Sequence, residues 1–346
     1  MRLSEGSKNG IILLSVSLFF FTTLELIARS DTPSNSLGYV PSSNDRIVYE
    51  LRPDYKLKSI KSEISSQKLN DMYFPLKKSP GVYRIACIGD SVSFGYKVKR
   101  EESFPKVLEK MLNEDNKGKY EVINFSVPGY NTAQESEILK EKVLGFDPDA
   151  VILVYCGNDT HLCNLIKPEV TPLNFLYVHS HYVHKILRNL DVKLKKSKGR
   201  NSFENSKWLW FKKNILGMFY HHITIYNQPG LELTTTYGDP SSSPELVPER
   251  YHYMLGFDNY RLHLSNIKDT LKRHNIKLIS CGFFNPRTLA INKEIGIERA
   301  LDLNNVFPDE SVFKSDFTIG NGDNHLNVKG HTLVAQYLYE KVWGTE

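Results

Sequence analysis

The sequence has few of the features that mark several large classes of protein. Only 4 of its 346 residues are cysteine, and it contains no Cys-x-x-Cys pair and no zinc-ligand spacing. Its net charge of +5, from 44 basic and 39 acidic residues, is small for this length. A charge balance of this kind gives no reason to expect a nucleic-acid partner. We therefore expect no metal, no cofactor and no nucleic acid.

The four cysteines also limit what can be expected of disulfides. Cys87 and Cys281 lie inside apolar runs typical of buried strands, so we expect both to be buried free thiols. Cys156 and Cys163 are close enough in sequence to bridge a short loop if the compartment is oxidising. The sequence leaves that pairing open, because spacing does not determine connectivity.

Long hydrophobic runs are absent except for one, Ile11 to Ala28, which contains only Ser, Thr and Glu25 as polar residues. A helix of about 18 residues, at about 1.5 Å each, nearly spans a bilayer core. Basic residues before the run predict a short cytoplasmic tail at 1–10, an anchor at 11–28 and the bulk of the chain outside, in the periplasm or at the cell surface. A cleaved signal peptide is the alternative, but no small-x-small cleavage site is evident. Glu25, near the outer end of the run, is assigned no function.

The rest of the chain divides by composition. Residues 29–81 contain five prolines and are expected to be a spacer, whereas residues 82–346 are expected to form the main domain. Residues from about 160 to 250 interrupt the alternation of strand-like and helix-like segments and are expected to form an insertion. Within it, the basic run Lys193 to Arg200 is either a solvated face or, beside a membrane, a contact for anionic lipid.

Strand-like and helix-like patterns alternate from residue 82 onward. The expected strands are Arg84–Ile88, Tyr120–Phe125, Asp149–Tyr155 and Lys277–Cys281, and the expected helices are Ser103–Asn113, Thr132–Leu144, Tyr260–His274 and Val328–Trp343, with a further helix and short strand near Ile291–Asn305. We expect Thr132 to cap its helix with Glu135 in a capping box, and Asn327 to cap the last helix. This alternation predicts an α/β fold with a mostly parallel sheet covered on both faces.

Residues suited to catalysis follow the ends of these strands. Ser91 follows the first strand, Gly129 the second and Asn158 the third, while Asp323 and His325 lie in a polar turn before the last helix. Ligands of parallel α/β sheets bind beyond the carboxyl ends of the strands. The sequence therefore predicts that these segments meet at one edge of the sheet.

Four short blocks in this order resemble the SGNH (GDSL-type) hydrolases. They are Gly89-Asp90-Ser91 with Gly95, the glycine of Asn124-Phe-Ser-Val-Pro-Gly129, Gly157-Asn158-Asp159, and Asp323-x-His325-Leu-Asn. The resemblance covers about residues 82–343, and the amino-terminal run resembles a membrane-anchored bacterial branch. The resemblance to the SGNH hydrolases implies a three-layer sandwich around a central, mostly parallel five-stranded sheet of the flavodoxin-like kind.

The same resemblance implies a role for each site residue. Ser91 would be the nucleophile, His325 the general base and Asp323 the group that orients the imidazole. The backbone N–H groups of Ser91 and Gly129, with the side-chain amide of Asn158, would form the oxyanion hole.

The last block departs from the family's common pattern. The family commonly has two residues between the aspartate and the histidine, whereas here only Asn324 intervenes. Asp323 is thus a weaker assignment than His325, and Asp316 is the alternative triad acid. His331, inside the last expected helix, is the nearest rival to His325.

These residues lead to one expected function and two alternatives. We expect a membrane-anchored serine esterase that removes an acyl group, such as acetyl, from a glycan or lipid of the cell envelope. An O-acyltransferase that passes the same acyl group to a sugar hydroxyl would use the same residues. A non-catalytic envelope protein that retains the fold is the third possibility.

Overall fold

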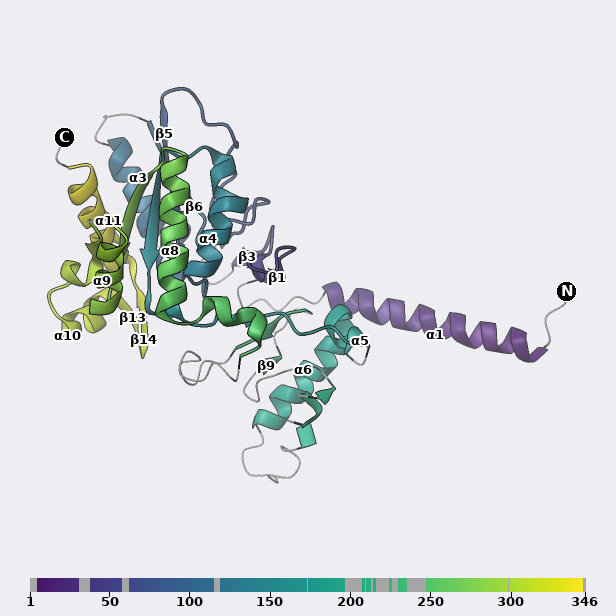
Figure 1. The fold of residues 1–346 in the computed structure, drawn as a ribbon. Helices are drawn as coiled ribbons and strands as arrows, with labels where there is room; N and C mark the ends of the chain where they lie inside the picture. The colour runs from purple at the N-terminus through teal and green to yellow at the C-terminus, as the bar shows by residue number, and fades with distance from the viewer. Residues whose placement is uncertain are drawn as a thin grey trace. The chain divides into compact units, whose positions relative to one another are not determined.

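We describe the fold from a computed structural model (Figure 1). The structure describes residues 5–30, 38–57, 62–114, 119–172, 174–196, 207–208, 210–212, 214–215, 224–225, 230–234, 247–297 and 299–344. The chain forms two compact units. The sheet unit comprises Asn35–Leu165 and Thr236–Glu346, and the helical unit comprises Met1–Ser34 and Ile166–Thr235. The expected insertion at about 160–250 thus largely coincides with the second segment of the helical unit.

A five-stranded parallel sheet is the centre of the sheet unit. Its strands are β5 (Val82–Ile88), β6 (Lys119–Asn124), β7 (Ala150–Tyr155), β11 (Lys277–Gly282) and β12 (Leu301–Asp302). They lie in the order β12-β11-β7-β5-β6, and all neighbouring pairs are parallel. All six residues of β7 are buried, as expected of a strand covered on both faces. The predicted α/β fold class is confirmed.

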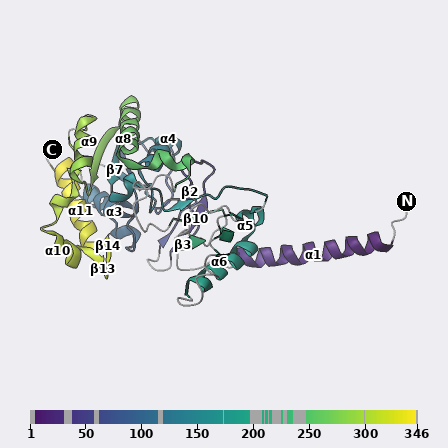
Figure 2. The same ribbon diagram turned by 60° about the horizontal axis from the view of Figure 1, so that its bottom comes forward.

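Helices cover both faces of this sheet (Figures 1 and 2). The longer helices are α3 (Phe104–Glu114), α4 (Thr132–Glu141), α8 (Gly256–Arg273), α9 (Pro286–Glu294) and α11 (Val328–Val342). Helices α3 and α11 contact each other, and their apolar side chains share one core cluster with β5, β7 and β11. Helix α4 packs against α8. These pairs form the outer two layers of the sandwich.

The predicted cap of α4 is wrong by one residue. The N-cap is Asn131, which accepts from the Gln134 amide at 3.2 Å, and Gln134 completes the capping box. The reason is tertiary, because the Thr132 hydroxyl donates instead to Asp159 at 2.6 Å and Glu135 is buried. The predicted cap of α11 is confirmed, since Asn327 accepts from the Gly330 amide at 3.1 Å.

The expected spacer at 29–81 differs from the structure, because its described residues from 38 onward pack as part of the sheet unit. It contains β1 (Tyr39–Pro41), β2 (Tyr49–Leu51), β3 (Lys56–Leu57) and β4 (Ser62–Glu63), which form two small antiparallel pairs. The buried Tyr49 hydroxyl donates to the Pro128 carbonyl at 3.1 Å. The Asn70 amide donates to the Phe94 carbonyl at 3.2 Å. These contacts brace two loops that carry candidate site residues.

Short elements complete the sheet unit. They are α2 (Ser91–Phe94), α10 (Glu310–Val312), the π-helical turn Phe313–Phe317, the hairpin β13 (Thr318–Gly320) with β14 (Asp323–Leu326), and the 3-10 turns Arg100–Glu102, Val143–Phe146, Gly157–Thr160, Glu249–Met254 and Leu303–Val306. All four cysteines are unbridged, so Cys156 and Cys163 are not paired.

Among the described residues of the helical unit, α1 (Glu5–Ser30) is the long helix, and α5 (Phe175–His179) and α6 (His181–Lys196) are shorter. Strand β8 (Leu165–Ile166) lies where the chain passes between the units, and β9 (Thr224–Ile225) pairs with β10 (Glu232–Leu233). Part of α1, Asn9–Arg29, is long and apolar enough to cross a membrane, by length and composition. Of the basic run Lys193 to Arg200, residues 197–200 lie outside the described part of the chain.

Candidate active site

Ser91 lies at the carboxyl end of β5, in the first position of the short helix α2. The Asp90 carboxylate caps this helix by accepting from the Val92 amide at 2.9 Å. Gly89 is required there because a Cβ would lie 2.3 Å from the Ser93 hydroxyl and 3.0 Å from Val154. The tight turn therefore presents the Ser91 side chain at the edge of the sheet.

His325 faces Ser91 from another part of the chain. The expected polar turn is instead the hairpin β13–β14, and His325 lies on β14. Its Nε2 is 2.9 Å from the Ser91 Oγ, which is hydrogen-bond distance. The rival His331 is buried, where its Nδ1 accepts from the Phe104 amide at 3.2 Å. Burial lowers the pKa of His331 to about 3.

Asp323 continues this chain of hydrogen bonds. Its Oδ1 is 2.6 Å from the His325 Nδ1 and accepts from the His325 backbone amide at 3.0 Å. Asp316 is exposed and accepts from the Ser315 hydroxyl at 2.6 Å, and in the described part of the chain no hydrogen bond joins its side chain to His325. The aspartate that contacts the imidazole is therefore Asp323.

Lys97 is a site residue that sequence reasoning missed. Its Nζ forms an ion pair with Asp323 Oδ2. Partial burial works to raise the pKa of the Asp323 carboxyl, but hydrogen bonds from Lys97 and from His325 outweigh it and hold that pKa well below its usual range. The same pair raises the pKa of Lys97. No motif marks Lys97, because the partners are 226 residues apart in sequence.

Gly129 and Asn158 lie on the loops after the two strands that flank β5. The Val127 amide donates to the Gly89 carbonyl at 3.1 Å, which ties the first of these loops to the Ser91 turn. Gly129 has a φ of +81°, and a Cβ there would lie 2.3 Å from the Asn164 side-chain nitrogen. The Asn158 side-chain amide donates to the Tyr130 carbonyl at 2.8 Å, which leaves its second N–H for another acceptor.

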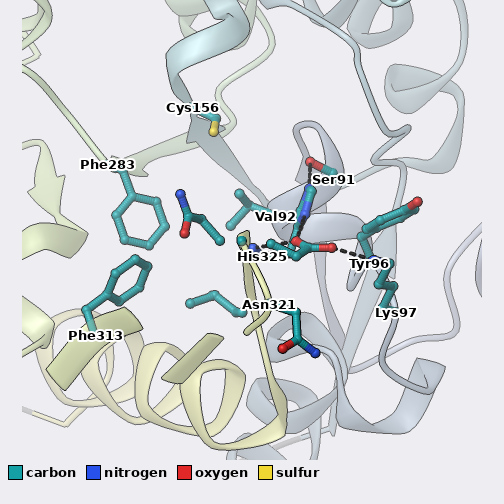
Figure 3. Close-up of a pocket in the computed structure, with 13 residues that line it drawn as sticks. Ser91, Val92, Tyr96, Lys97, Cys156, Phe283, Phe313, Asn321 and His325 are labelled. Atoms are coloured by element: carbon teal, nitrogen blue, oxygen red, sulfur yellow. Dashed lines mark hydrogen bonds and ion pairs between the residues drawn. The ribbon is translucent and has the colours of Figure 1, made fainter. Parts of the chain in front are cut away.

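A cavity of about 760 Å³ opens beside Ser91 and His325 (Figure 3). Figure 3 shows Phe283 and Phe313 on one side of it, and Tyr96 and Lys97 on the other. Gly129 and Asn158 are not among the residues that line it. A neighbouring cavity of about 540 Å³ shares Phe283, Phe313 and Asn324 with the first.

Three buried carboxyl groups lie behind this site, which the sequence did not lead us to expect. They belong to Asp90, Glu135 and Asp159, each no more than 2% exposed. Asp159 accepts from the Cys156 amide and the Thr132 hydroxyl, both at 2.6 Å, and so holds the loop that carries Asn158. Burial raises the pKa of Asp159 to about 8, and burial together with Asp159 raises the pKa of Glu135 well above its usual range.

Residues 87–196 match the GDSL-like Lipase/Acylhydrolase family. Over this segment the chain resembles the GDSL-type hydrolases. The match indicates an ester hydrolase. The matched segment includes Ser91, Gly129 and Asn158 and ends before Asp323 and His325, which the tertiary structure alone brings to the GDSL-type serine.

Solved structures similar to this GDSL-type chain include TesA, at 10% identity over 75% of this chain and 98% of that one, with a TM-score of 0.41. The esterase EstA from Pseudoalteromonas sp. is 12% identical over 76% of this chain and 99% of its own, with a TM-score of 0.41. Axe2, an acetyl xylan esterase from Geobacillus stearothermophilus, is 13% identical over 78% and 97%, with a TM-score of 0.41. The search of curated proteins found no match.

Proposed function

We propose that this GDSL-type hydrolase cleaves its ester through a Ser91–His325–Asp323 triad. The observation that carries the proposal is the continuous chain of hydrogen bonds from Ser91 Oγ through both imidazole nitrogens to Asp323 Oδ1. In this mechanism Ser91 Oγ attacks the ester carbonyl while His325 Nε2 takes its proton. The alcohol leaves with that proton, and water then releases the acid from the acyl-enzyme by the reverse transfers.

Asp323 has two functions in this mechanism. It holds the His325 proton on Nδ1, so that Nε2 is free to accept from Ser91, and its charge stabilises the imidazolium that forms. The ion pair with Lys97 and the low pKa of Asp323 support this assignment, because the carboxylate stays ionised at any pH at which an esterase works.

The oxyanion of the tetrahedral intermediate would be bound by the backbone N–H groups of Ser91 and Gly129 and by the Asn158 amide. Their placement after three adjacent strands supports this assignment. Each such donor contributes about 10²–10³-fold in rate in serine hydrolases.

We infer that the substrate is an ester, such as an O-acetyl ester, of a glycan or lipid of the cell envelope. The second cavity, which shares Phe283 and Phe313 with the first, supports a substrate that extends beyond the reacting ester group. Helix α1 is long and apolar enough to hold the chain in a membrane, which supports a substrate of the cell envelope. In this proposal α1 crosses the membrane with residues 1–10 in the cytoplasm, and the hydrolase domain acts on the other side.

A fluorophosphonate probe tests the triad directly. The full chain in detergent should be labelled at Ser91, and Ser91→Ala should abolish both the labelling and hydrolysis of a small aryl acetate. Ser315→Ala, at an exposed serine of the same unit, is the control and should leave both unchanged. Labelling that persists in Ser91→Ala would rule out Ser91 as the nucleophile. Acetylated glycans and longer-chain esters, supplied as competing substrates, then identify the preferred acyl group and alcohol.

A further inference from the structure

Glu25 is the only acidic residue between Asn9 and Arg29, and sequence reasoning assigned it no function. Its carboxylate accepts three hydrogen bonds from a segment about 155 residues away. The donors are the Ser180 hydroxyl at 2.8 Å, the His181 amide at 2.9 Å and the Tyr182 amide at 3.0 Å. Both elements belong to the helical unit, and Figures 1 and 2 show α5 and α6 at the C-terminal end of α1.

These amides belong to the first turn of α6, whose N–H groups have no partner within the helix. A carboxylate at a helix N-terminus satisfies such donors and interacts favourably with the helix dipole. Glu25 is thus a cap that one helix supplies to another. Side-chain packing supports the same contact between α1 and the start of α6, which we call the junction, because the rings of Phe21 and Tyr182 meet edge to face at 6.4 Å.

The junction lies at the end of the apolar segment. Glu25 is four residues from Arg29, or about 6 Å along the helix axis. Toward the N-terminus α1 is exposed on all sides, with Leu14 at 71% and Phe19 at 67%. Ala28 is by contrast buried at 8%. One end of α1 is therefore built into a folded unit, which is not expected of a segment that is cleaved off.

Helices α5 and α6 carry an exposed apolar surface beside this junction. Phe175 and Leu176 on α5 are each 53% exposed, and Ile186 on α6 is 49% exposed. Leu190 lies one turn beyond Ile186 at 39%, and the next position on that face is the exposed Lys193. Apolar side chains bordered by basic ones are the pattern of helices that lie in a membrane interface, where lysine and arginine meet anionic headgroups.

We propose that α1 stays in the mature protein, that Glu25 fixes the start of α6 at the Arg29 end of the membrane span, and that α5 and α6 rest in the lipid headgroup layer. The partner of this surface is the bilayer that holds α1, because the hydrogen bonds of Glu25 join the start of α6 to the apolar segment, in which Leu26 and Ile27 are 62% and 58% exposed. The proposal rests on the membrane anchoring proposed above and not on the ester chemistry.

The cap is tested in the full chain, reconstituted in nanodiscs that contain anionic lipid. Glu25→Ala should speed hydrogen exchange at the amides of His181 and Tyr182 by about 2- to 30-fold, the range expected when a helix cap is lost. Thr22→Ala is the matched control, since the Thr22 hydroxyl donates to the Leu18 carbonyl of its own helix. Equal exchange in the two variants would overturn the proposed cap.

The lipid contact is tested with a benzophenone amino acid at Leu176 or at Leu262. These two leucines are 53% and 54% exposed, and Leu262 lies on α8 of the sheet unit. We expect lipid adducts from Leu176 and few from Leu262. Equal yields at both positions, or a mature protein whose mass lacks α1, would overturn the proposal. Hydrolysis of an aryl acetate is measured on the same samples, so a failure of the ester chemistry is seen separately.

Discussion

Replacing Asp323 with asparagine tests whether this residue is the triad acid, the point on which the sequence left two candidates. Asp323 Oδ1 accepts from both the ring and the backbone amide of His325, at 2.6 and 3.0 Å. Asparagine keeps one oxygen, but its NH₂ group favours the opposite imidazole tautomer, in which Nε2 carries the proton and cannot accept from Ser91.

The size of the loss follows from how exposed the pair is. The same change in a fully buried triad costs about 10⁴-fold in kcat. Here the side chains of Asp323 and His325 are 21% and 33% exposed, so water moderates the effect. We expect a loss of about 10²–10³-fold, equivalent to about 3–4 kcal/mol of transition-state stabilisation.

The assay is kcat for an aryl acetate, measured with the full chain in detergent. Asp316→Asn is the matched control and should stay within about twofold of the wild type, as expected for an exposed substitution. A kcat of Asp323→Asn within about tenfold of the wild type would exclude Asp323 as the triad acid. A large loss in Asp316→Asn alone would transfer the role to Asp316.

Three further changes test the surroundings of the triad. Lys97→Met should lower kcat by about 1.4- to 5-fold, because a partly exposed ion pair contributes about 0.2–1 kcal/mol. The difference between the variant and the wild type should shrink at high salt, which screens the pair of Lys97 with Asp323. Gly129→Ala should destabilise the protein by at least about 1 kcal/mol in urea unfolding, since alanine disfavours a positive φ, and should also reduce kcat. Glu135→Gln tests the buried carboxyls through the pH dependence of stability. Because these pKa values are raised, the native state keeps protons that the unfolded chain releases, and this proton binding stabilises the native state. The stabilisation is complete below about pH 4, the usual pKa of a carboxyl group. It is lost as the pH rises through about 8, the pKa of Asp159. The variant should show a smaller decline in its urea midpoint over that range, and an unchanged decline would contradict a protonated Glu135.

Strand patterns were the most predictable part of the fold. The four expected strands agree with β5, β6, β7 and β11 to within two residues at each end. Buried parallel strands form continuous apolar runs, and such runs are recognisable without tertiary information. The early boundary of the sheet unit was harder to predict from the sequence, because Tyr49 is buried by contacts with residues far along the chain.

The sequence by itself indicated which loops carry the candidate site residues. Ser91, Gly129 and Asn158 each follow a parallel strand, and the ends of such strands meet at one edge whatever the side chains between them. Local pattern was enough for these residues, since their positions depend on chain direction and strand order.

Only the tertiary structure decided which charged groups act together. Asp323 rather than Asp316 contacts His325, Lys97 pairs with Asp323, and Glu25 caps α6 across about 155 residues of sequence. Hydrogen bonds and ion pairs act over a few ångströms, so their partners are defined by the folded positions of side chains that no sequence spacing records.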